Sequence, residues 1–191
     1  MSGSSRPAAR EAGSLSPSPW IVRFAHLVPP DARVLDLACG HGRHARFFAA
    51  RGCRVLAVDR DAVAVASLAD ATGVETAVFD LEAGTWPLAG ERFDAIVVAN
   101  YLHRPLLSHL VAALTDKGVL LYETFARGNE AYGRPSNPAF LLEPGELLRV
   151  VEGHLDVVAF EEGVVSRKGG LSVVQRIAAV GSQAGKPCRL A

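Results

Sequence analysis

The segment Val34-Leu-Asp-Leu-Ala-Cys-Gly-His-Gly-Arg-His44 decides the fold that this sequence predicts. It begins with a short apolar run, which is typical of a buried strand in a parallel sheet. Gly40 and Gly42 follow, and because neither carries a Cβ atom, the backbone can turn tightly and approach a ligand closely. A side chain at Gly42 should therefore obstruct that ligand. A helical pattern runs from Arg43 to Ala50, and a strand, a glycine turn and a helix start together predict a small-molecule site with outward-pointing backbone N–H groups.

Two kinds of ligand are compatible with this turn. Gly40-x-Gly42-x-x-Ala45 fits the dinucleotide-binding pattern, and Asp59 lies at about the right distance downstream for a ribose. Asp36 argues against a dinucleotide, because a carboxylate four residues before the first glycine would repel a diphosphate. The same carboxylate would attract a ligand that carries an ammonium group and a sulfonium.

The segment Asp36-Leu-Ala-Cys-Gly-His-Gly-Arg43 resembles the first motif of the class I S-adenosylmethionine-dependent methyltransferases. Residues 36–60 are similar to small bacterial methyltransferases of the tellurite-resistance type. Three later segments depart from that group: Asn100-Tyr-Leu-His-Arg104, Glu123-Thr-Phe125 and Arg134-Pro-Ser-Asn-Pro138. The resemblance covers residues 20–180 and implies a three-layer α/β/α domain. Its Rossmann-like, seven-stranded sheet would be mostly parallel, with an antiparallel C-terminal hairpin.

The resemblance implies S-adenosylmethionine as the cofactor and assigns it a set of residues. Asp59 would accept hydrogen bonds from the ribose hydroxyls, although it could instead only cap the helix that begins near Asp61. Asp80 would bond the adenine amino group with Leu81 packed beside the ring, although an aspartate after a strand is also ordinary turn chemistry. Asp36 would lie near the amino acid part. The complete set is Asp36, Ala38, Cys39, Gly40, Gly42, Arg43, Asp59, Arg60, Asp80, Leu81 and Asn100.

The residues that follow the fourth predicted strand are the catalytic candidates. Ligands of open parallel sheets bind outside the carboxyl ends of the strands, where the strand order reverses, so residues 100–104 should border the transferring methyl group. Tyr101 could offer its ring face to the sulfonium or merely pack. His103 could act as a base, because histidine exchanges protons near neutral pH, or be an exposed residue at a helix start. Arg104, like Arg134, could bind an anionic group of the acceptor or be solvated.

The remaining pattern predicts the order of the elements. Strands are expected at 34–37, 54–58, 74–79, 93–98 and 119–125, and a hairpin at 155–160 and 171–180 joined by 163–170. Helices are expected at 20–27, 43–50, 62–71, 106–114 and 145–151. Residues 126–144 form a long polar loop, which is typical of a functional loop or a lid. Trp20 and Phe24 could line the site or simply pack on the sheet.

Composition narrows the function further. The 191 residues suffice for one α/β domain, with tails at 1–19 and 181–191 expected to be disordered. Twenty basic and twenty acidic residues leave no electrostatic footprint for nucleic acid or an anionic membrane. We therefore expect a small-molecule or small-anion acceptor, held between residues 100–104 and the 126–144 loop. A nucleic-acid acceptor is disfavoured, and a monomer and a homodimer are both compatible.

The cysteines and the N-terminus bear on the compartment. Cys39, Cys53 and Cys188 are sparse and lack metal-ligand spacing, so no metal site is predicted and a reduced, cytoplasmic protein is expected. Cys39 could be a nucleophile, but a small packed residue is the favoured interpretation. No secretory signal or membrane-spanning run is apparent. A nicotinamide-binding protein and a non-catalytic cofactor-binding module stay open as alternatives.

Overall fold

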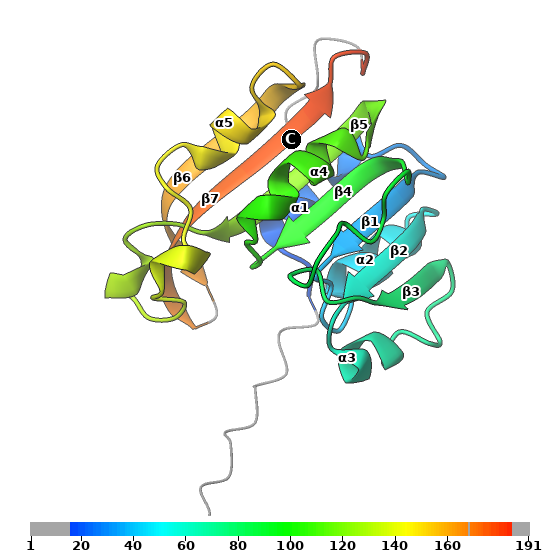
Figure 1. The fold of residues 1–191 in the computed structure, drawn as a ribbon, viewed down its shortest axis with the longest axis horizontal. Helices are drawn as coiled ribbons and strands as arrows, with labels where there is room; N and C mark the ends of the chain where they lie inside the picture. Colours follow the sequence, from blue (N-terminus) through cyan, green and yellow to red (C-terminus); the bar gives the residue numbers. More distant parts are fainter. Residues whose placement is uncertain (1–15, 168, 185–191) are drawn as a thin grey trace, which may run out of the picture.

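The computed structural model describes residues 16–167 and 169–184, and a seven-stranded sheet forms its centre (Figure 1). The strand order is β3-β2-β1-β4-β5-β7-β6. The first five strands pair in parallel, whereas β7 pairs antiparallel with both β5 and β6. The predicted Rossmann-like sheet with an antiparallel C-terminal hairpin is confirmed.

The elements follow the predicted order. The strands are β1 (Arg33–Leu37), β2 (Arg54–Asp59), β3 (Val74–Val78), β4 (Phe93–Ala99), β5 (Leu114–Phe125), β6 (Leu155–Arg167) and β7 (Gly170–Gly181). The α-helices are α1 (Pro19–Phe24), α2 (Arg43–Ala49), α3 (Ala62–Ala66), α4 (Leu107–Ala112) and α5 (Glu146–Val151). Short 3-10 helices are η1 (Ala25–Leu27), η2 (Arg104–Leu106), η3 (Asn129–Ala131) and η4 (Pro138–Phe140).

Helices cover both faces of the sheet and produce three layers. On one face, α4 and α5 pack over a cluster that includes Leu107 and Leu147. On the other face, α1, α2 and α3 pack over a cluster that includes Trp20, Phe24 and Phe48. Trp20 and Phe24 are at most 2% exposed, and the Trp20 Nε1–H group donates to the Ile177 carbonyl at 3.3 Å. These two aromatic residues therefore pack on the sheet, and the alternative that they line the site is wrong.

The C-terminal hairpin is longer than the sequence pattern suggested. Pairing continues from Leu155 opposite Gly181 to Arg167 opposite Gly170, so most of the expected linker 163–170 is strand. Gly163, the first residue of that expected linker, pairs with Val174 within the ladder. The longer hairpin places Arg167 at the same sheet edge as the ends of β4 and β5. There its guanidinium donates a hydrogen bond to Asn100.

Helix α3 ends at Ala66, earlier than the predicted 71, and β5 begins at Leu114, earlier than the predicted 119. The start of β5 is irregular, because the register with β4 shifts between Phe93 and Ala95. Asp94, at the entrance of β4, accepts hydrogen bonds from Arg33 N–H and the Thr115 hydroxyl at 2.9 and 3.3 Å.

The polar loop 126–144 is ordered by its own contacts. Ala126 and Leu142 form an isolated parallel bridge that closes its base. Asn129 is buried; its amide donates to Pro135 O at 2.9 Å and accepts from Val173 N–H at 3.0 Å. The second of these bonds fixes the loop against β7.

The ends of the domain are only partly described. Ser18 is the N-cap of α1, and its side chain accepts from Trp20 N–H. Residues 1–15 and 185–191, which hold most of the two expected tails and Cys188, lie outside the described residues. Within 16–167 and 169–184, no helix is long and apolar enough to span a membrane. The same ranges contain no group of three or more potential metal-ligating side chains.

Candidate cofactor and acceptor site

A pocket of about 210 Å³ lies at the carboxyl ends of the strands, at the point where the strand order reverses. β2 and β3 follow β1 on one side, whereas β4 and β5 continue on its other side. We call this cavity the switch-point pocket; its lining residues are Ala38, Asp59, Arg60, Phe79, Asp80, Leu81, Glu82, Asn100 and Tyr101. Seven of the residues that the sequence singled out therefore meet here, from four different strand ends.

The predicted glycine turn lies beside this pocket. Ala38, Gly40 and Gly42 all have positive φ angles of 53°, 54° and 70°. Cys39 N–H donates to Val58 O at 3.0 Å, and Gly40 N–H donates to Asp59 Oδ2 at 2.8 Å. These bonds attach the turn to the end of β2, so its shape is fixed before any ligand binds.

Cys39 packs rather than reacts. Its side chain is buried, and its thiol donates to Gly40 O at 3.5 Å. Burial raises the pKa of the thiol, and the nearby carboxylates of Asp36 and Asp59 raise it further. Because the thiolate is the reactive form, this thiol has the properties of a structural cysteine.

The two glycines of the turn differ in what a side chain would meet. A Cβ atom on Gly42 would lie 2.3 Å from Leu68 Cδ2, in the core under α3, whereas a Cβ on Gly40 would meet nothing within 4 Å. The expectation that a side chain at Gly42 would obstruct the ligand stays a prediction, and the structure adds that the side chain would clash with Leu68.

This difference gives a paired prediction. Gly42→Ala should lower the free energy of unfolding by about 2 kcal/mol or more, because left-handed strain adds to overpacking. Gly40→Ala should cost only the strain of about 1–2 kcal/mol, but it should weaken binding of S-adenosylhomocysteine at least tenfold. Urea unfolding and calorimetry measure both quantities. Equal destabilisation by the two variants would contradict this assignment.

Asp59 is the central polar group of the pocket. Its Oδ2 atom accepts from Gly40 N–H and its Oδ1 atom accepts from Asp61 N–H, at 2.8 and 2.9 Å. The cap of α3 is Asp61, which accepts from Val63 and Ala64 N–H. The alternative that Asp59 only caps this helix is therefore wrong. Each Asp59 oxygen keeps acceptor capacity toward the pocket.

The residues after β3 form the far wall. Asp80 Oδ1 accepts a hydrogen bond from Glu82 N–H at 3.0 Å. This is the side-chain-to-backbone bond of an ordinary turn, which was the alternative role for Asp80. Leu81 is 7% exposed and lines the pocket, and Arg60 is an exposed neighbour that pairs with Glu82 at 3.9 Å. The contact of Asp80 and Leu81 with adenine stays a prediction.

Asp36 does not line the pocket. Its side chain is buried, and Oδ2 accepts from Ala45 N–H at 2.8 Å in the first turn of α2. Burial raises its pKa to about 7, against the opposing effects of the Ala45 hydrogen bond and the Arg43 charge. Asp36 therefore has a structural role at the start of α2, and its position near the amino acid part of the cofactor stays a prediction.

This burial makes stability depend on pH. In the unfolded chain Asp36 ionises near 3.8, whereas in the folded protein it holds its proton up to about 7. Between these values the folded state binds more protons, so the contribution of Asp36 to stability is lost as the pH rises. Asp36→Asn should therefore be more stable than the parent near pH 8 and match it within about 1 kcal/mol near pH 4. Thermal unfolding across this range tests the prediction; a difference that does not change with pH would contradict it.

Tyr101 belongs to the switch-point pocket. Its hydroxyl oxygen is buried without a hydrogen-bond partner among the described residues. Burial raises its pKa to about 12, and the charge of Glu82 acts in the same direction. The Tyr101 carbonyl accepts from the Tyr122 hydroxyl at 2.9 Å, which fixes the backbone at this point. A buried hydroxyl without a partner beside a cavity is a group that a bound ligand could satisfy.

Arg104 has a structural role. Its Nε and Nη2 atoms bond Glu146 at 2.8 and 2.9 Å, and further N–H groups bond the carbonyls of Ala139 and Leu141. The hydrogen bond with Glu146 raises the pKa of Arg104. Its guanidinium therefore attaches the 126–144 loop to α5, which corrects the expectation that it binds an acceptor. His103 is half-buried before η2, while Arg134 is exposed.

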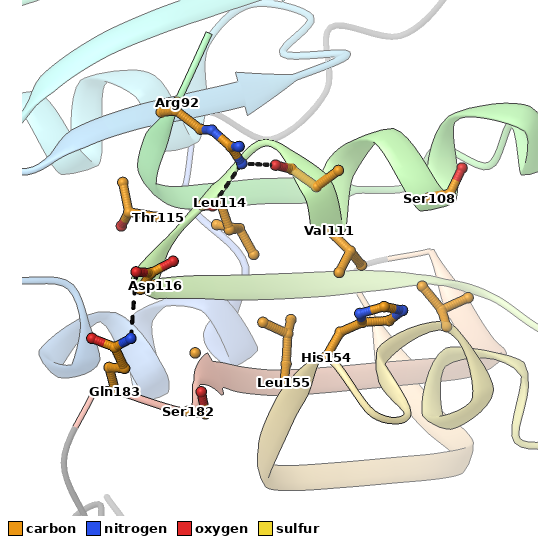
Figure 2. Close-up of a pocket in the computed structure, with 13 residues that line it drawn as sticks. Arg92, Ser108, Val111, Leu114, Thr115, Asp116, His154, Leu155, Ser182 and Gln183 are labelled. Carbon is orange, nitrogen blue, oxygen red and sulfur yellow. Dashed lines mark hydrogen bonds between the residues drawn. The ribbon is translucent and has the colours of Figure 1, made fainter. Parts of the chain in front are cut away.

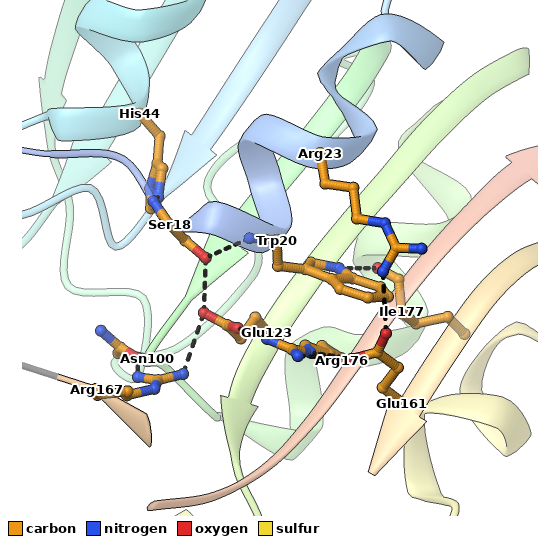
Figure 3. Close-up of polar contacts among 10 residues, drawn as sticks. All are labelled: Ser18, Trp20, Arg23, His44, Asn100, Glu123, Glu161, Arg167, Arg176 and Ile177. Carbon is orange, nitrogen blue, oxygen red and sulfur yellow. Dashed lines mark hydrogen bonds and ion pairs between the residues drawn. The ribbon is translucent and has the colours of Figure 1, made fainter. Parts of the chain in front are cut away.

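A polar network at the ends of β5 and the hairpin completes the site (Figure 3). Glu123 is 4% exposed; its carboxylate accepts from the Ser18 hydroxyl at 2.9 Å and from Arg176 at 3.3 Å. Arg167 lies 3.1 Å from Glu123 and also donates to Asn100 Oδ1 at 2.8 Å. Asn100 thus joins this network to the switch-point pocket.

Ser18 also connects the network to α2. Its backbone N–H donates to His44 Nε2 at 3.1 Å, so the other ring nitrogen carries the proton. Burial lowers the pKa of His44 to about 3. Sequence reasoning missed Ser18, His44, Arg167 and Arg176. Glu123 and Arg176 are register partners of opposite charge across β5 and β7, but this pairing is visible only once the register is known.

A larger pocket of about 410 Å³ lies at the opposite ends of the strands (Figure 2). Leu114 and Leu155, at the starts of β5 and β6, line it. Arg92 in its wall donates to the carbonyls of Ala112 and Leu114, and Gln183 donates to Asp116. Because ligands of parallel sheets bind at the carboxyl ends, size alone does not make this pocket the cofactor site.

Comparison with known proteins agrees with this geometry. A family model described as "Methyltransferase domain" matches residues 34–118, which include the glycine turn and the switch-point pocket. Ribosomal RNA small subunit methyltransferase J from Psychromonas ingrahamii is 47% identical over 69 residues, or 36% of this chain. The match spans only 26% of that protein's length.

Solved structures share the fold at low sequence identity. TehB from Haemophilus influenzae has a TM-score of 0.72 at 20% identity, covering 85% of this chain and 61% of TehB. A TehB-like SAM-dependent methyltransferase from Corynebacterium glutamicum has a TM-score of 0.60 at 21% identity, covering 85% and 87%. Magnesium protoporphyrin IX methyltransferase from Synechocystis, solved with bound SAH, has a TM-score of 0.63 at 18% identity, covering 85% and 79%. With its glycine turn and its sheet, the chain has the fold of the class I S-adenosylmethionine-dependent methyltransferases, and its residues 34–118 match the methyltransferase domain family.

Proposed function

We propose that this chain transfers the methyl group of S-adenosylmethionine to a small-molecule acceptor. The observation that carries the proposal is the switch-point pocket, where the Asp59 carboxylate and the Tyr101 hydroxyl lie beside a glycine turn. When bound, the cofactor supplies a methyl group on a positively charged sulfur, which an acceptor can attack.

The pocket residues fit an adenosine. Asp59 offers a carboxylate with free acceptor capacity to a ribose, and Leu81 and Phe79 offer apolar surface to a base. The buried Tyr101 hydroxyl would gain the partner that it lacks among the described residues. Ala38, Asp80, Arg60 and Asn100 would complete the cofactor contacts, with the turn at 39–43 behind them.

The acceptor side is proposed to lie between residues 100–104 and the 126–144 loop. Asn100, directly after β4, contacts both the switch-point pocket and Arg167, so the two substrates would meet there. Methyl transfer requires mainly that the reactants be aligned, and fixed side chains supply that alignment. A base is needed only if the acceptor keeps a proton, and His103 is the proposed group for that case.

An RNA acceptor is the competing proposal, because the relative from Psychromonas ingrahamii is named as a ribosomal RNA methyltransferase. The balance of twenty basic and twenty acidic residues argues against it, since a protein that neutralises many phosphates carries a basic excess. A non-catalytic cofactor-binding module would use the same pocket without turnover.

Calorimetry with S-adenosylhomocysteine and with NAD, followed by an assay of slow methyl loss from S-adenosylmethionine, tests these proposals. We expect binding of S-adenosylhomocysteine and not of NAD, with slow background turnover to the demethylated product. Binding of NAD alone would overturn the cofactor. Tight S-adenosylhomocysteine binding without any turnover would favour the binding module. Salt-sensitive methylation of ribosomal RNA fragments would replace the small-molecule acceptor.

A further inference from the structure

The polar network around Glu123 is a chain of alternating charges with cations at both ends (Figure 3). Arg167 pairs with Glu123, Glu123 with Arg176, Arg176 with Glu161, and Glu161 with Arg23. Three guanidinium groups therefore share two carboxylates.

The two ends differ in their surroundings. At the outer end, the Arg23 side chain is 46% exposed and its charge is screened by water. At the inner end, Arg167 is 25% exposed and lies over the Phe125 ring, with 5.2 Å between its Cζ atom and the ring centroid. Its Nη2 atom is buried and makes no hydrogen bond among the described residues, although it lies 3.1 Å from Glu123 Oε1 as an ion pair.

A further cation strengthens the imbalance at the inner end. Arg43, at the start of α2, is half-buried, and burial lowers its pKa. The charge of Glu123 raises this pKa again, and the charge of Arg167 lowers it, so Arg43 lies within electrostatic reach of both groups. Asp36 also raises this pKa. The two partly desolvated cations therefore face Glu123, which Arg176 also shares, and the buried Asp36.

We propose that Arg167 binds a carboxylate group of the methyl acceptor. The inference rests on the proposed function, because Asn100 connects Arg167 to the switch-point pocket through a 2.8 Å hydrogen bond. The part of the Arg167 guanidinium that stays exposed offers a planar cation to a carboxylate, and partial burial strengthens the attraction. The Phe125 ring beneath the guanidinium provides apolar surface for the organic part of such an acid. A cationic amine acceptor would be repelled by the same two arginines.

The test uses the protein saturated with S-adenosylhomocysteine and titrated with benzoate, with the neutral isostere benzamide and with inorganic sulfate. We expect benzoate to bind at least tenfold more tightly than benzamide and sulfate. Arg167→Gln should remove at least tenfold of the benzoate affinity, and Arg167→Lys, which keeps the charge without the fork, should retain part of it. Arg23→Gln is the matched control, because it removes the same charge from the outer end, and it should leave benzoate binding unchanged within about twofold.

Each other outcome overturns the inference in a distinct way. Equal affinity of the parent for benzoate and benzamide would exclude a carboxylate subsite. Sulfate that binds as well as benzoate would make the ligand an inorganic oxyanion. Arg167→Gln could instead lose affinity for S-adenosylhomocysteine itself. If Arg167→Lys is folded and keeps that affinity, Arg167 would hold the carboxylate of the cofactor. A parent that binds benzoate but no S-adenosylhomocysteine would instead refute the proposed function.

Discussion

Replacing Asp59 by alanine should weaken binding of S-adenosylhomocysteine by about tenfold to a hundredfold. A hydrogen bond to a charged group contributes about 1.5–3 kcal/mol, and the variant removes the carboxylate proposed to receive the ribose hydroxyls. It also frees Gly40 N–H, which Asp59 holds at 2.8 Å, so the glycine turn loses part of its fixed shape. Both effects reduce affinity, and calorimetry measures their sum.

The matched control is Asp61→Ala, two residues along the chain. Asp61 caps α3 by accepting from Val63 and Ala64 N–H, and it does not line the switch-point pocket. Its loss should cost about 0.5–2 kcal/mol of stability and change the affinity less than threefold. Equal affinities of Asp59→Ala and the parent would refute the ribose assignment, whereas equal losses in both variants would point to α3 rather than to a direct contact.

The cofactor half of the site was readable in the sequence because it depends on local order. In parallel strands the carboxyl ends meet at one edge, so Asp59, Asp80 and Asn100 had to converge once their strands were recognised. The direction of each side chain was not readable. Asp36 stands four residues before Gly40, yet it is buried and bonds Ala45 N–H.

The acceptor half depends on contacts between distant segments. Arg104 looked available for an anion, but Glu146, which is 42 residues away, holds it at 2.8 Å. Arg167 lay in a segment with glycines at 163, 169 and 170 that suggested a loop. The ladder between β6 and β7 instead continues to Arg167 and brings it to Asn100, 67 residues away. No local pattern reports such a pairing.

Glu123→Ala should have the largest effect on stability, lowering the free energy of unfolding by about 3 kcal/mol. Removing one partner of a buried ion pair typically costs about 3–5 kcal/mol, because the remaining charge stays buried without compensation. Here the side chain of Glu123 is 5% exposed, while those of Arg167 and Arg176 are 25% and 21% exposed. Water can partly solvate these arginines, which places the expected loss at the lower end of the range.

Glu161→Ala is the matched comparison, because Glu161 is also a glutamate between two arginines of the same network. Its side chain is 43% exposed, so its loss should cost about 1 kcal/mol or less and shrink further in high salt. Chemical unfolding of both variants at two salt concentrations measures this contrast. Glu123→Gln should fall between the alanine variant and the parent, because it keeps the volume and an acceptor for the Ser18 hydroxyl but loses the charge. If Glu123→Ala and Glu161→Ala were equally stable, the cations at the inner end would have to be solvated, and the electrostatic basis for an acidic acceptor would fail with them.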